Sequence, residues 1–439
     1  MTTVSELVGR CLTALGVTRV FGSTASGLSG IPGLPHVLVE DPALAVLLAD
    51  AAGRIGAGPG VALLPDRVLH LGSQPGARAE SFVLDDVEAL PAALAGWDAG
   101  SVFAAVEYQL AVDLDAPTPL HLEPVHLDDG TTASTLAPDM AAVRSLVLAG
   151  PGVVRANAVP VLHDVAERLG AGVVNTWGAK GVYRWDSPFH FGTAGLQARD
   201  AELAGLTSAE LVITTGLDPN EMPIDQWANG PVLDVDPRVL EALTYRWEPS
   251  TRELERPPLY DVLSSALQPL YASEAVPLSP ARAAADLGAV RPTGSVIVAD
   301  PGPAGLWVAR ALPTVELGSV VVPSLPVRGF AMAAAVGASL EGRRAVAVVP
   351  DPIDEATGEL LALAEHWNAD VVLEVWGADA PLRSTAERRS RIGDAMSRPG
   401  VAVQPTPVDF SQTRVLVEAA GPIVAWPERD VGVSGNGQR

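Results

Sequence analysis

Helical and strand-like patterns of apolar residues alternate along the first quarter of the chain. Residues 4–15 place apolar side chains at helical spacing, and residues 18–22 form a short apolar run after them. A helix expected at 42–56 separates the strands expected at 36–40 and 60–65. Because strands and helices take turns, the pattern predicts an α/β unit.

The same alternation returns twice. The second unit is expected to have strands at 145–149, 172–177, 210–216 and 231–236 and a helix at 158–170. The third is expected to have strands at 295–300, 317–323, 345–350 and 370–376, with helices at 303–312, 328–340 and 355–367. This predicts three doubly wound α/β domains with mostly parallel sheets, whose ligands bind at the carboxyl ends of the strands.

Proline-rich and polar stretches divide the chain between these units. The predicted division is a first domain at 1–130, a central domain at 140–250, a connection at 251–290, a third domain at 291–427 and a disordered tail at 428–439.

Composition narrows the functional classes. The 29 Lys and Arg against 52 Asp and Glu give a net charge of −23, which repels nucleic acid and anionic membrane surfaces. The single cysteine, Cys11, excludes an intramolecular disulfide and a cysteine-based zinc site. No secretory signal pattern opens the sequence and no apolar run is long enough to span a bilayer, so a cytoplasmic protein is expected.

Phrases in all three units resemble one enzyme family. The stretches LTALGVTRVFG, VVNTWGAKGVYRWDSPFHFG and VRGFAMAAAVGASL look like conserved phrases of the thiamine-diphosphate-dependent enzymes of the acetolactate synthase and 2-oxo acid decarboxylase group. The resemblance covers nearly the whole chain and implies pyrimidine-binding, central and diphosphate-binding domains, in that order. It also implies an oligomer, because in the family the pyrimidine domain of one subunit faces the diphosphate domain of another.

The resemblance implies a glutamate that activates the cofactor as a general acid-base group. The matching position is Pro42, and the nearest carboxylates upstream are Glu40 and Asp41. Glu40 is therefore the candidate catalytic residue. The alternative interpretation is that it is a solvated acid at a strand end.

The resemblance also implies a magnesium site that holds the cofactor's diphosphate. Asp351 matches the family's metal-binding aspartate, but Pro350 and Pro352 replace the glycines on either side of it. The family's asparagines fall at about 375–377, where Glu374 is a candidate replacement ligand. Arg328 and Gly329 open the glycine-rich helix and are candidate anion-binding residues.

Three further features depart from or add to this pattern. The first domain is short, with only DRVLHLGSQPGAR between residues 65 and 79, so it is expected to lack an element or two. The central turn at 150–154 could place FAD or another nucleotide at a helix start, or could be a tight turn that binds nothing. Lys180, the chain's only lysine, is a candidate phosphate contact or covalent base, or has a structural role.

The departures at Pro42, at 350–352 and at Trp376 favour a degenerate acetolactate synthase-like protein that has lost its cofactor. It would act as a binding, regulatory or structural subunit, as a homo-oligomer (dimer or tetramer) or paired with an active relative. The alternative is an active thiamine-diphosphate-dependent 2-oxo acid decarboxylase or carboligase. In that case Asp351 would hold magnesium, Glu374 or Asp379 would replace the family's asparagines, and Glu40 would activate the cofactor. A third possibility is a nucleotide- or acyl-CoA-binding protein that uses the central domain.

Overall fold

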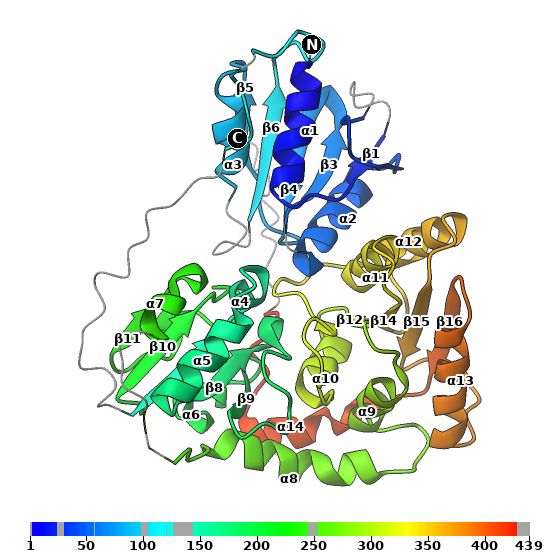
Figure 1. Cartoon of the computed structure of the whole chain (residues 1–439). Coiled ribbons are helices and arrows are strands. Elements are labelled where there is room, and N and C mark those ends of the chain that lie inside the picture. Colours follow the sequence, from blue (N-terminus) through cyan, green and yellow to red (C-terminus); the bar gives the residue numbers. More distant parts are fainter. Residues whose placement is uncertain are drawn as a thin grey trace, which may run out of the picture.

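Three β-sheets, each with its own helices, make up the protein (Figure 1). The computed structural model describes residues 2–23, 30–56, 58–97, 104–119, 121–125, 144–244, 250 and 253–427. The predicted boundary near residue 130 and the tail at 428–439 lie outside these ranges. The predicted α/β class with three mostly parallel sheets is confirmed. Within the described residues, no helix has both the length and the apolar character needed to cross a membrane.

The first domain stands above the other two in Figure 1. Its sheet has the order β2-β1-β3-β4-β6-β5, and β4 runs antiparallel to both of its neighbours. The strands are β1 Val20–Gly22, β2 His36–Leu38, β3 Gly60–Leu64, β4 Val68–Gly72, β5 Glu80–Leu84 and β6 Ala105–Leu110. The helices are α1 Val4–Ala14, α2 Pro42–Ile55 and α3 Leu90–Ala95.

The segment at residues 65–79, which the sequence showed to be short, begins with a hairpin turn between β3 and β4. Asp66 and Arg67 both have positive φ, at 59° and 58°, in the turn that joins β3 to β4. A tight turn of this kind matches the twist of two antiparallel strands. The segment thus supplies a strand, β4, that the apolar pattern did not predict.

The central domain has a fully parallel sheet in the order β11-β10-β7-β8-β9. Its first strand, β7, lies between the second and the fourth, so the topology switches direction between β7 and β10. The strands are β7 Ser145–Ala149, β8 Gly172–Thr176, β9 His190–Ala194, β10 Leu211–Thr215 and β11 Val232–Asp234. The helices are α4 Gly152–Arg155, α5 Val159–Leu169, α6 Asp200–Leu203 and α7 Glu241–Thr244.

The third domain is also fully parallel, in the order β13-β12-β14-β15-β16, and its switch point lies between β12 and β14. The strands are β12 Val296–Ala299, β13 Val320–Val321, β14 Ala345–Pro350, β15 Val371–Trp376 and β16 Ala402–Thr406. The helices are α10 Pro303–Ala311, α11 Phe330–Leu340, α12 Glu355–His366, α13 Thr385–Ser397 and α14 Thr413–Ala420.

Helices α8 (Pro258–Ala272) and α9 (Pro280–Val290) connect the central and third domains. Helix α8 runs beneath both domains in Figure 1 and packs against β9 and α14. Two hydrogen bonds tie α14 back to the central domain: the backbone N–H of Arg199 donates to the Ala420 carbonyl, and Gln197 Nε2 donates to the Leu416 carbonyl. Helix α14 of the third domain is therefore hydrogen-bonded to the central domain.

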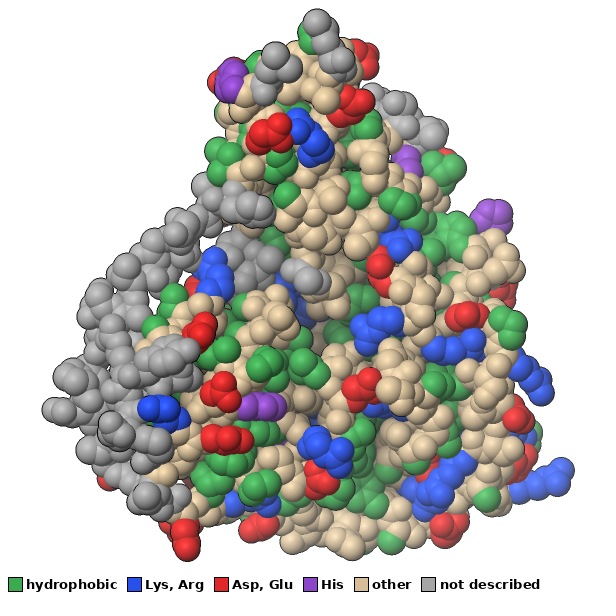
Figure 2. Space-filling model, viewed as in Figure 1, with side chains coloured by type: hydrophobic (Ala, Val, Ile, Leu, Met, Phe, Trp, Pro, Cys, Tyr) green, Lys and Arg blue, Asp and Glu red, His purple; other side chains and the backbone are tan. Residues whose placement is uncertain are grey.

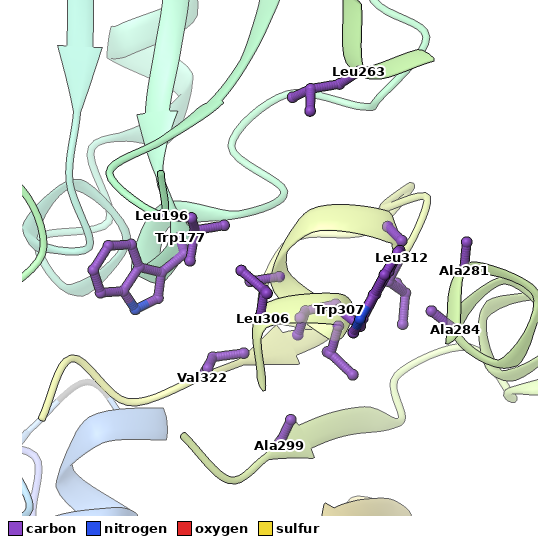
Figure 3. Packing of buried hydrophobic residues seen from close by; sticks show 14 of the residues in the cluster. Trp177, Leu196, Leu263, Ala281, Ala284, Ala299, Leu306, Trp307, Leu312 and Val322 are labelled. Atoms are coloured by element: carbon purple, nitrogen blue, oxygen red, sulfur yellow. The ribbon is translucent and has the colours of Figure 1, made fainter. Parts of the chain in front are cut away.

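One apolar core crosses the boundary between the central and third domains. Trp177 and Leu196 of the central domain belong to the same buried cluster as Leu306, Trp307 and Val322 of the third domain (Figure 3). A second cluster joins the first domain to the third, because α2 packs directly against α11. The domains are thus held together by continuous apolar packing, the main favourable term in association.

Buried polar groups meet where the three domains touch. Arg54 of α2 donates to Gln74 Oε1 at 2.9 Å, to Asp218 Oδ2 at 3.0 Å and to Glu221 Oε1 at 2.6 Å. Ser324 of the third domain donates to Asp218 Oδ2 at 2.7 Å. Each acid therefore has a polar partner from another domain, as burial of a charge requires.

On the face shown in Figure 2, positively and negatively charged surface side chains lie among one another. Figure 2 shows Lys and Arg side chains scattered singly among Asp and Glu side chains over the described part of the face in view. With a net charge of −23, such a surface offers no concentrated attraction for a phosphate backbone in this view.

Candidate functional site

The carboxyl edge of the third sheet carries two aspartates at its switch point. Asp300 directly follows β12, and Asp351 directly follows β14. Neighbouring strands that end at a switch point open a crevice where ligands of α/β domains bind. Asp300 is buried there, at 4% exposure, whereas Asp351 is exposed.

Asp300 caps the helix that follows the next strand. Its Oδ1 accepts a hydrogen bond of 2.7 Å from the backbone N–H of Ala331, in the first turn of α11. The start of a helix carries a partial positive charge, so a carboxylate is favourable at this position. Burial, helped by the Asp354 carboxylate, nevertheless raises the Asp300 pKa to about 7.

The glycine before α11 is packed closely against helix α12. Gly329 has φ +74°, which favours glycine, and a Cβ there would lie 2.9 Å from the Ala356 Cβ. The preceding Arg328 is exposed and makes no hydrogen bond or ion pair with a described residue. The amino end of α11 is therefore occupied by Asp300 and the first turn of α12, and Arg328 projects outside it.

Asp351 lies between two residues that lack a backbone N–H, Pro350 and Pro352. Its own N–H is directed across the sheet and donates to the Trp376 carbonyl at 2.9 Å. No group of three or more His, Cys, Asp or Glu side chains suited to a metal ion occurs in the described part of the chain. Asp351 thus has no described neighbours that would complete a cation site.

Glu374 is buried in β15, two residues before the carboxyl end of that strand. Its Oε2 accepts hydrogen bonds from Arg388 at 2.8 Å, Trp376 Nε1 at 3.1 Å and Thr406 Oγ1 at 3.0 Å. The side chains of Glu374 and Arg388 are 1% and 3% exposed. Among the described residues, no hydrogen bond or ion pair joins Glu374 to Asp351, and Glu374 forms a buried ion pair with Arg388 instead.

Glu40 lies in the first domain, two residues after β2. It is exposed, accepts a hydrogen bond of 2.8 Å from Ser23 Oγ, and lines a groove of about 850 Å³ between β2 and α12. The groove also contains Glu359, His366 and Trp367. Asp351, Arg328 and Gly329 do not line it, so within this chain Glu40 is separate from the other candidates.

The residues at the third-sheet edge do not fit a magnesium-bound diphosphate. Magnesium requires near-octahedral oxygen ligands, and a phosphate at a helix start requires free backbone N–H groups. Here the carboxylate at the metal-binding position, Asp351, is flanked by prolines, and the N–H of Ala331 already donates to Asp300. These are properties of one chain's third domain, so a partner subunit would not alter them.

The candidate nucleotide turn of the central domain is closed by its own backbone. The N–H of Gly152 donates to the Gly216 carbonyl at 2.8 Å, and a Cβ on Gly150 would lie 2.2 Å from that oxygen. Beside it is a cavity of about 440 Å³ lined by Asp225, Asp234 and Asp236, among others. Carboxylates suit ribose hydroxyls but repel phosphates, so binding of FAD or another nucleotide there stays a prediction.

Comparison with known proteins agrees with this architecture. Residues 140–242 match the family described as "Thiamine pyrophosphate enzyme, central domain". A Rhodococcus jostii RHA1 thiamine diphosphate-dependent 4-hydroxybenzoylformate decarboxylase superposes with a TM-score of 0.69 at 18% identity, covering 94% of this chain and 100% of that one. A Mycobacterium smegmatis protein assigned as a thiamin diphosphate-dependent enzyme gives a TM-score of 0.66 at 19% identity, covering 93% and 99%. No curated protein matches by sequence.

These matches show the fold of the protein. The chain has a three-domain fold like that of thiamine diphosphate-dependent enzymes, and residues 140–242 match the central-domain model of that family. The resemblance noted in the sequence is confirmed at this level. Fold alone does not carry an activity, which depends on the site.

Asp300 was not among the candidates from the sequence. The available signal was an acid at the carboxyl end of the first strand of a parallel unit, a common position for functional side chains. The sequence does not show the hydrogen-bond partner of Asp300. Ala331 is 31 residues away along the chain, and only the fold places its N–H beside the Asp300 carboxylate.

Asp300 should make folding stability depend on pH. Because its folded pKa of about 7 lies above the ordinary 3.8, the folded state binds the proton more tightly, and this contribution is lost as pH rises from about 4 to 7. At about 1.4 kcal/mol per pKa unit, the loss is at most about 4 kcal/mol. We expect Asp300→Asn to lose less stability than the wild type between pH 5 and 8 in urea unfolding.

The matched control for that experiment is Asp351→Asn, an exposed aspartate at the same edge. This variant should follow the wild-type pH profile. A profile of Asp300→Asn that parallels the wild type would contradict the raised pKa.

Proposed function

We propose that this protein is a non-catalytic member of the thiamine-diphosphate enzyme fold, serving as a binding, regulatory or structural subunit. The observation that carries the proposal is at the third-sheet edge: Asp300 and α12 occupy the amino end of α11, where a diphosphate would need free N–H donors. The burial of Glu374 against Arg388 supports it, because that carboxylate is already paired with a guanidinium and withdrawn from solvent.

The assembly that we propose is an oligomer, either of this chain alone or with an active relative. The groove beside Glu40 lies open at the surface between β2 and α12, and the exposed Leu38 borders it. Such a groove is accessible to another subunit.

The test is a calorimetric titration of the protein with thiamine diphosphate in excess magnesium. We expect no saturable heat from the wild type or from Asp351→Asn. A thiamine-diphosphate-dependent decarboxylase in the same buffer provides the positive control. Saturable binding to the wild type would overturn the proposal, whether or not Asp351→Asn removes it.

The alternative function is an active 2-oxo acid decarboxylase or carboligase with an atypical metal site. It is favoured by the whole-chain likeness to the Rhodococcus jostii RHA1 decarboxylase and to the Mycobacterium smegmatis protein. Under this alternative, binding would be lost in Asp351→Asn, and the wild type would release carbon dioxide from 2-oxo acids.

A further inference from the structure

A separate cavity of about 500 Å³ lies between the central domain, helix α8 and helix α10. It is outside the third-sheet edge and outside the nucleotide turn, and none of the residues discussed at those places lines it. Its size is in the range of pockets that bind small organic molecules. The basic and aromatic residues that line it are Lys180, Trp185, His190, Tyr260, Tyr271 and Arg310.

Lys180 is a buried cation without a partner. It is the only lysine of the chain, the residue is 9% exposed, and it lines the cavity. Its side-chain amine makes no hydrogen bond or ion pair with any described residue. A buried charge is costly unless it is paired, so this position is unfavourable for the protein alone.

The neighbouring charges do not compensate Lys180. Arg310 is already paired with Asp200 through two contacts of 2.9 and 2.7 Å, and it also donates to the Thr193 carbonyl. Arg256 donates to the Ser187 carbonyl. Asp200 is the acid that pairs with Arg310, which leaves Lys180 as an excess positive group among the described residues at the cavity.

Burial and the charge of Arg310 lower the Lys180 pKa to about 7. Burial, with the charges of Lys180 and Arg256, lowers the His190 pKa to about 3, so this imidazole is neutral at neutral pH. The cavity therefore contains one amine that is ready to take up a proton when an anion enters.

The remaining wall of the cavity consists of aromatic and aliphatic side chains, which suit a flat apolar group such as an aromatic ring. The Tyr260 ring has the Arg256 guanidinium 4.1 Å from its centroid and meets the His190 ring edge to face. Tyr271 donates its hydroxyl hydrogen to the Ala311 carbonyl at 2.6 Å, which holds its ring in place. The apolar side chains of Leu263 and Leu267 complete this wall.

We propose that this cavity binds a small aromatic carboxylate, whose carboxylate pairs with the Lys180 ammonium while its ring lies against the tyrosines and leucines. An ion pair in a site withdrawn from water is stronger than one at the surface, and it removes the cost of the unpaired lysine. The lining is mostly aliphatic and aromatic and contains one free cation, which favours a carboxylate with an apolar body over an inorganic phosphate. The inference goes beyond the proposed function and does not depend on whether the third-domain cofactor site is lost.

The test uses 2-naphthoate and its neutral counterpart 2-naphthamide as probes, with titration calorimetry of the full chain. We expect Lys180→Met to weaken 2-naphthoate binding about tenfold or more and to leave 2-naphthamide binding unchanged, because the variant removes charge and keeps length. Ser265→Ala, at an exposed position of the same helix α8 that does not line the cavity, is the matched control and should bind as the wild type does. Circular dichroism and urea unfolding check that each variant is folded.

The binding should also take up protons. With the free Lys180 pKa at about 7, 2-naphthoate binding at pH 7 should take up about half a proton, measured from the heats in buffers of different ionisation enthalpy. Lys180→Met should show no such uptake.

The proposal fails if the wild type shows no saturable binding of 2-naphthoate, if Lys180→Met binds it as tightly as the wild type, or if the variant loses both probes equally. The titration contains no thiamine diphosphate, so its outcome is separate from that of the cofactor experiment.

Discussion

Replacement of Arg310 by methionine should destabilise the protein by about 3–5 kcal/mol, because it leaves a buried carboxylate without its cation. Arg310 and Asp200 are each 1% exposed, and they join α10 of the third domain to α6 of the central domain. The Asp200 Oδ2 also accepts the backbone N–H groups of Leu196 and Gln197, so it cannot turn away to water. Arg310→Met thus removes the counter-charge and the bond to the Thr193 carbonyl together.

Urea unfolding followed by circular dichroism measures this loss. The double variant Arg310→Met, Asp200→Asn should lose less stability than the sum of the two single variants, since it removes both charges. Arg328→Met is the matched control, an exposed arginine of the same domain without a described partner, and should change stability by no more than about 0.5 kcal/mol. Equal losses in Arg310→Met and Arg328→Met would contradict the role of the buried pair.

The second large effect is expected at Glu374, where the structural role and the metal-ligand role make opposite predictions. Glu374→Gln keeps the shape of the side chain but leaves the buried Arg388 guanidinium with only Asp286, at 3.5 Å, as an acidic neighbour. We expect a loss of about 3 kcal/mol in urea unfolding with EDTA present. If Glu374 were instead a metal ligand, the substitution would have little effect in metal-free protein.

The control for Glu374→Gln is Asp351→Asn, at the exposed position in the same sheet. Its stability in EDTA should stay within about 0.5 kcal/mol of the wild type. A Glu374→Gln variant as stable as this control would show that the ion pair with Arg388 is not a structural requirement.

Several elements could be predicted from local sequence because their signals are local. Helix α2 begins at Pro42, where a missing N–H costs nothing, and Asp41 caps it by accepting the N–H groups of Ala43 and Leu44. Strands β12, β14 and β15 lie within the predicted runs, because parallel strands covered on both faces are apolar throughout. Strand β4 was missed since its hairpin depends on positive φ at Asp66 and Arg67, residues that rarely adopt it.

The candidate site was much less predictable, for a physical reason visible at Glu374. Every residue of β15 is buried, so alternation along the strand does not show which face a side chain takes. The partner that decides its role, Arg388, comes from helix α13, an element the apolar pattern did not predict. Lys180 is similar: the sequence shows a lone lysine, but only the packing of α8 and α10 makes it a buried cation at a cavity.

The sequence by itself determined the α/β class, the alternation of strands and helices and the likeness to one superfamily, because these depend on periodicity and on short conserved phrases. Only the tertiary structure decided that Asp300 occupies the start of α11, that Glu374 pairs with Arg388 and that Lys180 faces a cavity without a counter-charge. The reason is that charge pairing and burial depend on groups far apart in the chain, whose meeting is a property of the packed domains.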